Sequence, residues 1–336
     1  MLEHPRAPKL VEDSYSRSTS STFVCVPPRP RRVPARATMA FALLVTLGMH
    51  ALVTRSLASL STGVTMEVLH CGTQAMTSST PPVLFVHGTF HGAWCWEPWL
   101  EQFAAAGIES YAVSLRGTSG SPVDQKSVKI TEHVQDLLSL VSTTFAETPP
   151  VIVGHSFGGA SCLKYLESNG ATSGAVLLCS VPPSGNGPMV GRFLRRSLRQ
   201  AWLITIGFAM KRAATDAQVC RDLFFDDGTP LDEIATYLPR LEADAQIGLD
   251  VSHFLTELPS KNAGDDGLAT WLGTPSRVPT LVLGAERDGV VDREAVEETA
   301  AFLGTEAEFY DLPHDVMLCR GREAPAERII AWVKAL

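Results

Sequence analysis

From about residue 65 onward, short runs of β-branched and apolar residues alternate with longer segments whose apolar positions recur at a helical period. This alternation predicts parallel strands joined by helical crossovers. Strands are expected at Met66–Cys71, Val83–His87, Ser110–Leu115, Val151–Gly154, Ala175–Cys179, Thr280–Gly284 and Ala307–Tyr310. Helices are expected at Trp96–Ala106, Thr131–Phe145, Phe157–Ser168, Arg293–Phe302 and Pro325–Lys334. The pattern therefore predicts an α/β fold with a doubly wound, mostly parallel sheet and helices on both faces.

The alternation is interrupted once, between Cys179 and Thr280, where no convincing strand occurs. This segment contains helix-like stretches at Arg192–Met210 and Leu231–Asp244. We therefore expect a helical insertion at one edge of the sheet. The expected division is a core made of residues 65–183 and 271–336, with a helical cap at residues 184–270.

The first 64 residues differ in composition from the rest of the chain. No acidic residue occurs between Ser14 and Thr65, whereas arginine, serine and threonine are frequent. Such a composition is typical of an organellar transit peptide. We expect residues 1–64 to be a transit peptide or a disordered extension, with the plastid as the favoured destination and the mitochondrion or cytoplasm as alternatives. The apolar run Met39–Val53 is shorter than the roughly 20 residues of a membrane-spanning helix, which leaves a signal segment, a short anchor or a helix packed on the body.

Composition and charge exclude several classes of protein. The 336 residues are 45% hydrophobic, which is too apolar for a disordered chain. Residues 1–66 carry eight basic and three acidic side chains, so the remaining body has a net charge of −13, the opposite of a nucleic-acid binder. The seven cysteines include no CxxC and no metal-like pairing with histidine. They indicate buried free thiols, not a zinc site or a disulfide framework, and leave a single incidental bridge as the alternative.

The strongest chemical signal is the segment Gly154-His155-Ser156-Phe157-Gly158, which stands between an expected strand and an expected helix. In this context G-x-S-x-G predicts a nucleophile elbow, a sharp turn that lifts a strained serine above the sheet. The turn needs small neighbours, which Gly154 and Gly158 supply. The N–H of Phe157 and the positive end of the following helix then face a developing oxyanion. Ser156 is therefore the expected nucleophile.

A serine nucleophile needs a base, and the base needs an acid that orients it. In the strand-turn-helix arrangement the chain order is Ser, acid, His. Only His253 and His314 follow Ser156, and His314 comes after the last strand whereas His253 falls in the insertion, where packing or pocket lining is expected. Asp288 lies four residues past the strand that ends at Gly284 and is the expected acid, with Glu286 as its rival. Two aspartates near the base, Asp311 and Asp315, are expected to be solvated or to cap a turn.

The loop after the second expected strand should supply the other oxyanion donor. Gly88 would let the backbone turn sharply over the site, so that the N–H of Thr89 points inward. His87 is expected to hold this loop by hydrogen bonds, and His155 to be structural. No Gly-rich nucleotide fingerprint, HExxH motif or paired-carboxylate helix occurs in the sequence, so neither a metal nor a nucleotide cofactor is expected.

On His87-Gly88, the segment 154–158, Asp288 and His314, the chain from about residue 65 to 336 resembles the α/β-hydrolase fold superfamily. The segments Val86–Trp96 and 179–186 further resemble a poorly characterised group of plant and algal hydrolases that are often predicted to be plastid-targeted. The resemblance implies an α/β-hydrolase fold, a cap over the site, and cleavage of a carboxylic ester, thioester or related acyl bond through an acyl-enzyme. Epoxide hydrolases and haloalkane dehalogenases of this superfamily have Asp at the elbow, where this chain has Ser156.

The expected function is that of a serine hydrolase acting on a small-molecule or lipid ester. An acyltransferase, a hydroxynitrile-lyase-type enzyme and a non-enzymatic ligand receptor on the same fold remain as alternatives. The expected cap includes a basic amphipathic segment at residues 191–202. This segment is either an ordinary cap helix with a solvated basic face or a site of peripheral membrane contact.

Overall fold

The computed structural model describes residues 11–14, 52–72, 80–273 and 278–336. Most of the N-terminal extension expected from the sequence, including nearly all of the apolar run 39–53, lies outside the described residues. Among the described helices, none is both long and apolar enough to cross a lipid bilayer.

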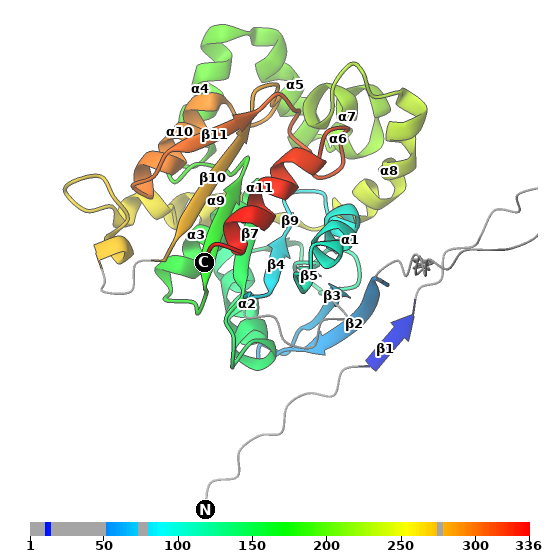
Figure 1. Ribbon diagram of the computed structural model, residues 1–336. Coiled ribbons are helices and arrows are strands. Elements are labelled where there is room, and N and C mark those ends of the chain that lie inside the picture. Colours follow the sequence, from blue (N-terminus) through cyan, green and yellow to red (C-terminus); the bar gives the residue numbers. More distant parts are fainter. Residues whose placement is uncertain (1–10, 15–51, 73–79, 274–277) are drawn as a thin grey trace, which may run out of the picture.

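A nine-stranded sheet forms the centre of the molecule (Figure 1). In spatial order its strands are β1 (Val11–Ser14), β2 (Thr54–Ser59), β3 (Thr65–Cys71), β5 (Ser110–Val113), β4 (Val83–Val86), β7 (Val151–His155), β8 (Gly174–Leu178), β10 (Thr280–Ala285) and β11 (Ala307–Tyr310). The strands from β5 to β11 pair in parallel, whereas β1, β2 and β3 pair antiparallel, as do β3 and β5. The mostly parallel sheet predicted from the sequence is confirmed.

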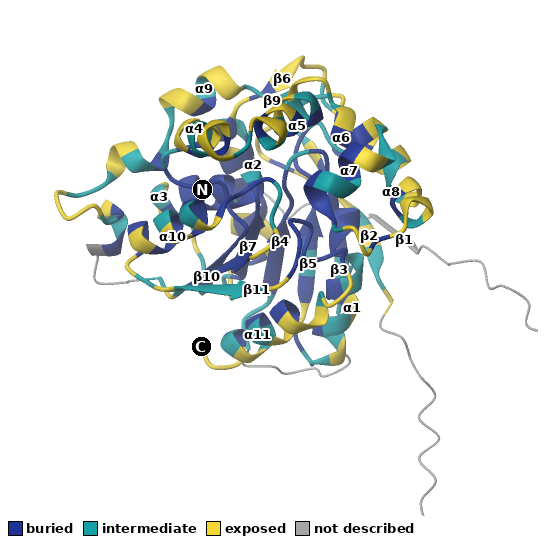
Figure 2. Cartoon of the chain, turned by 90° about the horizontal axis from the view of Figure 1, so that it is seen from above, coloured by how far each residue is buried: buried dark blue, intermediate teal, exposed yellow. Residues whose placement is uncertain are grey.

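Helices cover both faces of this sheet (Figure 2). One face carries α1 (Glu97–Ala105) and α11 (Glu323–Val333); the other carries α2 (Ile130–Thr144), α3 (Phe157–Glu167) and α10 (Arg293–Phe302). Strands β4, β7 and β8 are buried at every position. Because both faces of these strands are covered, they appear in the sequence as continuous apolar runs without alternation. Each expected strand and helix of the core is present, with its ends within one or two residues.

The sheet begins earlier than the boundary at residue 65 that was expected from the sequence. Strand β2 pairs with β3 along its whole length, from Thr54 opposite His70 to Ser59 opposite Thr65. Its sequence is short, mixed and largely exposed, so it carries no apolar signal. Arg55, which ends the apolar run of the extension, forms an ion pair with Glu67 on β3.

The segment between β8 and β10 forms the helical insertion above the sheet (Figure 1). Its helices are α4 (Asn186–Arg196), α5 (Leu198–Ala209), α6 (Arg212–Thr215), α7 (Ala217–Phe224), α8 (Leu231–Asp244) and α9 (Val251–Thr256). The helix expected at Arg192–Met210 is thus two helices, because Ser197 is extended and its hydroxyl caps the N-terminus of α5. A two-residue strand, β9 (Gly248–Leu249), pairs with β6 (Ser127–Val128) of the core.

Candidate active site

Ser156 lies at the turn between β7 and α3, where the expected nucleophile elbow falls. Its backbone has φ 54° and ψ −122°, a conformation that a non-glycine residue adopts only under strain. The hydroxyl therefore stands at the carboxyl end of a buried strand and at the N-terminus of α3. Only 5% of Ser156 is exposed.

Three glycines around Ser156 are required by close approach. A Cβ on Gly158 would lie 2.4 Å from the carbonyl oxygen of His87, and one on Gly154 would lie 2.6 Å from Sγ of Cys162. A Cβ on Gly88 would lie 2.7 Å from Cβ of Ser156. Gly88 was expected to provide a sharp turn, but the left-handed residue of that loop is Phe90, with φ 66°. Gly88 instead allows the loop to pass directly over the serine.

His314 and Asp288 are joined by a short hydrogen bond. His314 follows β11 and donates from Nδ1 to Oδ2 of Asp288 at 2.7 Å. The other carboxylate oxygen of Asp288 accepts two backbone N–H bonds, from Val290 and Val291, each at 2.7 Å. Both side chains are almost wholly buried, at 2% and 1% exposure. The rival acid, Glu286, is exposed and pairs with Arg293.

The serine loop contacts the histidine loop directly through the residue before the nucleophile. Nε2 of His155 donates to the carbonyl oxygen of His314 at 3.0 Å, and the two rings are 4.6 Å apart at their centres. Within the described residues, the hydroxyl of Ser156 makes no hydrogen bond to His314. Such bonds are often long in unliganded enzymes and tighten when substrate binds. Ser156, Asp288 and His314 all follow the carboxyl ends of sheet strands, at β7, β10 and β11.

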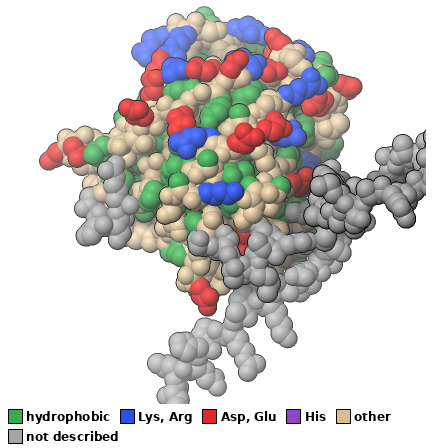
Figure 3. Space-filling view, in the orientation of Figure 1, with side chains coloured by type: hydrophobic (Ala, Val, Ile, Leu, Met, Phe, Trp, Pro, Cys, Tyr) green, Lys and Arg blue, Asp and Glu red, His purple; other side chains and the backbone are tan. Residues whose placement is uncertain are grey.

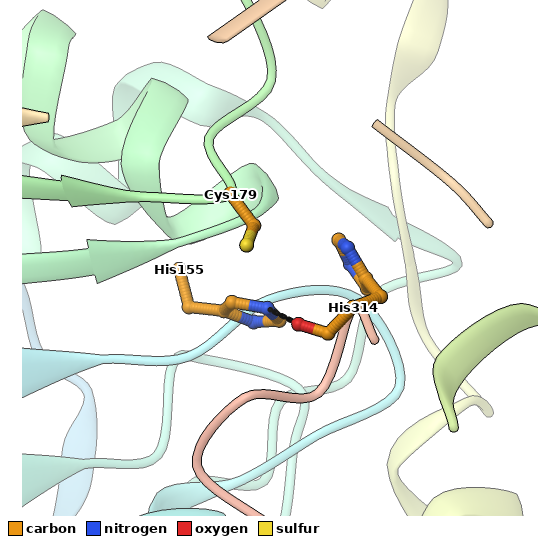
Figure 4. Close-up of side chains that lie close together, drawn as sticks. All are labelled: His155, Cys179 and His314. Atoms are coloured by element: carbon orange, nitrogen blue, oxygen red, sulfur yellow. Dashed lines mark hydrogen bonds between the residues drawn. The ribbon is translucent and has the colours of Figure 1, made fainter. Parts of the chain in front are cut away.

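Cys179 completes a buried cluster with these two histidines (Figure 4). One ligand atom each of His155, Cys179 and His314 lies within 4.8 Å of the others. Burial, with the nearby charge of Asp288, raises the pKa of the Cys179 thiol and keeps it protonated, whereas a metal ligand must be a thiolate. In addition, Nδ1 of His314 is already bonded to Asp288. The cluster is therefore better explained as the packing around the base than as a metal centre.

The six cysteines in the described part of the chain are all free and buried. This agrees with the buried thiols expected from the sequence. Cys25 lies outside the described residues.

The loop after β4 carries the expected oxyanion donor Thr89. In the described part of the chain, no hydrogen bond uses the N–H of Thr89 or that of Phe157, the first residue of α3. His87 holds this loop: its Nδ1 donates to the carbonyl of Gly88 at 2.8 Å, and its Nε2 accepts from the N–H of Leu115 at 2.9 Å. Burial lowers the pKa of His87 to about 3, so its ring is neutral.

A buried ion pair that sequence reasoning missed connects the oxyanion loop to the histidine loop. His91 donates from Nδ1 to the carbonyl of Thr89 at 2.8 Å and from Nε2 to Oδ2 of Asp315 at 2.9 Å. Because a carbonyl and a carboxylate only accept, both ring nitrogens carry protons and His91 is a cation. Burial alone would lower the pKa of His91, but the charge and hydrogen bond of Asp315 raise it above its ordinary value.

The expectation that Asp315 is solvated or caps a turn was wrong, since its side chain is completely buried. Burial would raise the pKa of Asp315, but the charge and hydrogen bond of His91 lower it overall. His91 and Asp315 are 224 positions apart in the sequence, so no local sequence pattern predicts that they pair. Asp311, by contrast, has an 82% exposed side chain that pairs with Arg287.

A pocket lies beside the oxyanion loop, with about 500 Å³ of empty space when its open mouth is included. Gly88, Thr89 and Phe157 line it on the core side, and Ile247 and Leu249 line it on the side of the insertion. The pocket therefore reaches the position where an oxyanion would form.

The charged groups of this pocket are already paired. Arg116 donates from Nε and Nη2 to Asp136 at 2.6 and 2.7 Å, and from Nη1 to Glu132 at 2.9 Å. Burial lowers the pKa of His133 to about 4, which leaves its ring neutral. Asp244 accepts bonds from the indole of Trp94 and from Ser119, and burial raises its pKa. Among the described residues that line the pocket, none is an unpaired cation.

Comparison with known proteins places the chain in a family. The model of the alpha/beta hydrolase family matches residues 83–332, which is most of the chain. The chain belongs to the alpha/beta hydrolase family. The similarity to this superfamily that the sequence motifs indicated is thereby confirmed.

Two plant proteins are similar to part of the chain. A pheophorbidase of Raphanus sativus is 38% identical over 84 residues, which is 25% of this chain and 32% of that protein. A protein of Arabidopsis thaliana is named as a chloroplastic methylesterase. It is 35% identical over 83 residues, which is 24% of this chain and 24% of that protein. The chain thus spans between a quarter and a third of the length of these curated relatives.

Most of the fold is shared with a solved structure at low sequence identity. An esterase from Exiguobacterium antarcticum superposes with a TM-score of 0.60 over 83% of this chain and 98% of its own, at 18% identity. At this identity the comparison establishes the architecture alone.

Proposed function

We propose that this protein is a serine hydrolase that cleaves a carboxylic ester through an acyl-enzyme. The observation that carries the proposal is the buried 2.7 Å bond between Asp288 and His314, at the same edge of the sheet as the strained Ser156. Membership of the alpha/beta hydrolase family and the names of the relatives support the same class of reaction. No contact described above favours an acyltransferase, a lyase or a receptor.

In the proposed mechanism, the bond to Asp288 keeps the proton of His314 on Nδ1, so that Nε2 is free to accept. Oγ of Ser156 attacks the acyl carbon while Nε2 of His314 takes its proton. The N–H groups of Thr89 and Phe157 stabilise the oxyanion. His314 then protonates the departing alcohol, and water activated by His314 attacks the acyl-enzyme and releases the acid. The backbone bonds to Asp288 prevent its carboxylate from rotating away during these proton transfers.

We further propose that the substrate is a neutral ester of a small alcohol. The relatives named as methylesterases support a small alcohol. The pocket supports a neutral acyl group, since the guanidinium of Arg116 is saturated by Asp136 and Glu132. Residues 184–270 act as the cap that covers this pocket. The acid-free stretch that precedes β2, residues 15–53, acts as a plastid transit peptide, a role supported by its composition and by the chloroplastic relative. Residues 54–64, which the sequence assigned to the same extension, belong to the folded core because β2 pairs with β3.

The proposal is tested with a panel of methyl esters and p-nitrophenyl esters of increasing acyl length. We expect the wild type to release the acid, with a preference that reveals the size of the pocket. Ser156→Ala should lower kcat by at least about 10⁴-fold, whereas Ser142→Ala, at an exposed position of α2, should leave it unchanged. Hydrolysis that survives Ser156→Ala would contradict the proposal, and transfer to an added alcohol in place of hydrolysis would change the reaction class.

A further inference from the structure

Helix α5 lies on the outside of the cap, yet it is apolar on nearly all sides. Its twelve residues include one charged side chain, that of Arg199. A surface helix normally presents a polar face to water, and a helix that is apolar all round is normally buried. The outer face of α5 therefore has the character of a contact surface.

Three large apolar side chains are exposed along α5 and at its C-terminal end. At 3.6 residues per turn, Leu198 and Trp202 lie about 40° apart around the helix axis, and Met210 follows at the C-terminal end, about 80° further round. They are 75%, 62% and 66% exposed. Ala201, Leu203 and Gly207 of the same helix are buried. We call Leu198, Trp202 and Met210 the α5 patch.

This part of the chain also concentrates exposed apolar residues. Among the described residues, eleven large hydrophobic side chains are exposed, and five of them lie between Val190 and Met210. Single exposed hydrophobic residues are ordinary, whereas a cluster marks an interaction site. Trp202 is the exposed member of the six tryptophans, all of which are described; tryptophan is enriched where a protein meets the membrane–water interface.

Basic side chains are concentrated in the segment that carries the patch, although several of them pair with carboxylates of other elements. No acidic residue occurs between Glu167 and Asp216, whereas six basic residues do. Basic side chains lie over the top of the molecule, where α4 and α5 are found (Figures 1 and 3). Arg195 has no ion pair among the described residues, and Arg199, which is 79% exposed, makes one long ion pair with Asp222 at 3.4 Å. This local excess is notable on a body whose net charge is −13.

The inner side of the same helix covers the candidate active site. Phe208 of α5 stacks on Phe90 of the oxyanion loop, with ring centres 5.5 Å apart. Phe208 also contacts Phe224, which in turn lies 5.9 Å from the ring of His314. A surface that binds the outside of α5 would therefore lie next to the roof of the pocket.

We propose that the α5 patch lies in the surface of an anionic lipid bilayer and brings the pocket to a lipophilic ester dissolved there. Apolar side chains flanked by arginines match such a surface in both hydrophobicity and charge. A second copy of this chain is a poorer match, because a two-fold contact through the patch would place the arginines of each copy near those of the other. The substrate part of this inference rests on the proposed function, whereas the membrane contact does not.

The membrane contact is tested by flotation of the full chain with phosphatidylcholine vesicles, with and without phosphatidylglycerol. We expect binding to the anionic vesicles. Leu198→Gln with Trp202→Gln should weaken it about 100-fold, since burial of each side chain is worth roughly tenfold. Arg195→Gln with Arg199→Gln should weaken it about 25-fold, and only on anionic vesicles. The matched control, Leu231→Gln with Leu336→Gln, removes two exposed apolar residues elsewhere and should bind like the wild type.

Each outcome decides the inference. A loss of less than threefold in the Leu198 and Trp202 variant, or no binding of the wild type, would overturn it. A wild-type dimer that this variant converts to a monomer, without vesicle binding, would assign the patch to a second copy instead. Ser156→Ala should bind vesicles like the wild type. Membrane binding can therefore be judged even if the proposed hydrolysis is not observed. Binding should also blue-shift the Trp202 fluorescence, and Trp202→Phe should abolish the shift.

Discussion

Exchange of Asp288 for asparagine should disable His314 by forcing the wrong tautomer. The two backbone N–H groups of Val290 and Val291 point at one oxygen of the Asp288 carboxylate. They will hold the carbonyl oxygen of an asparagine in the same place. The amide nitrogen of the asparagine must then take the place of the other carboxylate oxygen, which lies 2.7 Å from Nδ1 of His314 in the wild type. Because this nitrogen can only donate, Nδ1 must lose its proton and Nε2 must carry it.

The expected loss in kcat follows because Nε2 of His314 can no longer accept a proton. A ring protonated at Nε2 cannot accept the proton of Ser156, and a triad aspartate exchanged for asparagine lowers kcat by about 10⁴-fold. That factor corresponds to about 5.5 kcal/mol of transition-state stabilisation. KM should change little, because Asp288 is buried behind His314 and does not line the pocket.

The assay is steady-state hydrolysis of a p-nitrophenyl ester by wild type, Asp288→Asn and the matched control Asp311→Asn. Asp311→Asn exchanges the same two residue types close to His314 in the sequence, but the side chain of Asp311 is exposed and pairs with Arg287. The control should retain full activity. Activity of Asp288→Asn within tenfold of the wild type, in a variant that melts like the wild type, would refute the reasoning.

Three further changes test the surroundings of the site. Asp315→Asn should lower the free energy of unfolding by about 3 to 5 kcal/mol at neutral pH by leaving the cation of His91 unpaired. Because folding lowers the pKa of Asp315, this difference should persist down to the ordinary pKa of an aspartate, about 3.9, and shrink below it, as urea titrations from about pH 2 to about pH 7 would show. Gly158→Ala should prevent stable folding, because its Cβ would lie 2.4 Å from the carbonyl oxygen of His87, and the melting temperature checks this. Gly191→Ala, at an open position inside α4, should raise stability by up to about 1 kcal/mol, measured in the same melts.

The buried core was readable from the sequence because burial on both faces leaves a continuous apolar run. Strands β4, β7 and β8 are such runs, and each was predicted to within one residue. Strand β2 was not, since a largely exposed strand of mixed residues has no apolar signal. The break between α4 and α5 was missed because Ser197 interrupts an otherwise continuous helical pattern.

For the candidate site, the residues that follow strands were the ones that sequence reasoning could find. Ser156, Asp288 and His314 each come a few positions after a recognisable apolar run, so topology predicts that they meet at one edge of the sheet. The His91–Asp315 pair has no such marker, since only the folded chain brings the two loops together. The cap was the least readable part, because helices on the surface of a core are specified by packing that distant residues provide.

The central claim is that Ser156 is the nucleophile. It is tested most directly by treating the protein with a fluorophosphonate and locating the adduct by peptide mass spectrometry. We predict one modified residue, Ser156, and no labelling in Ser156→Ala. An adduct on another residue, or labelling that persists in Ser156→Ala, would contradict the claim.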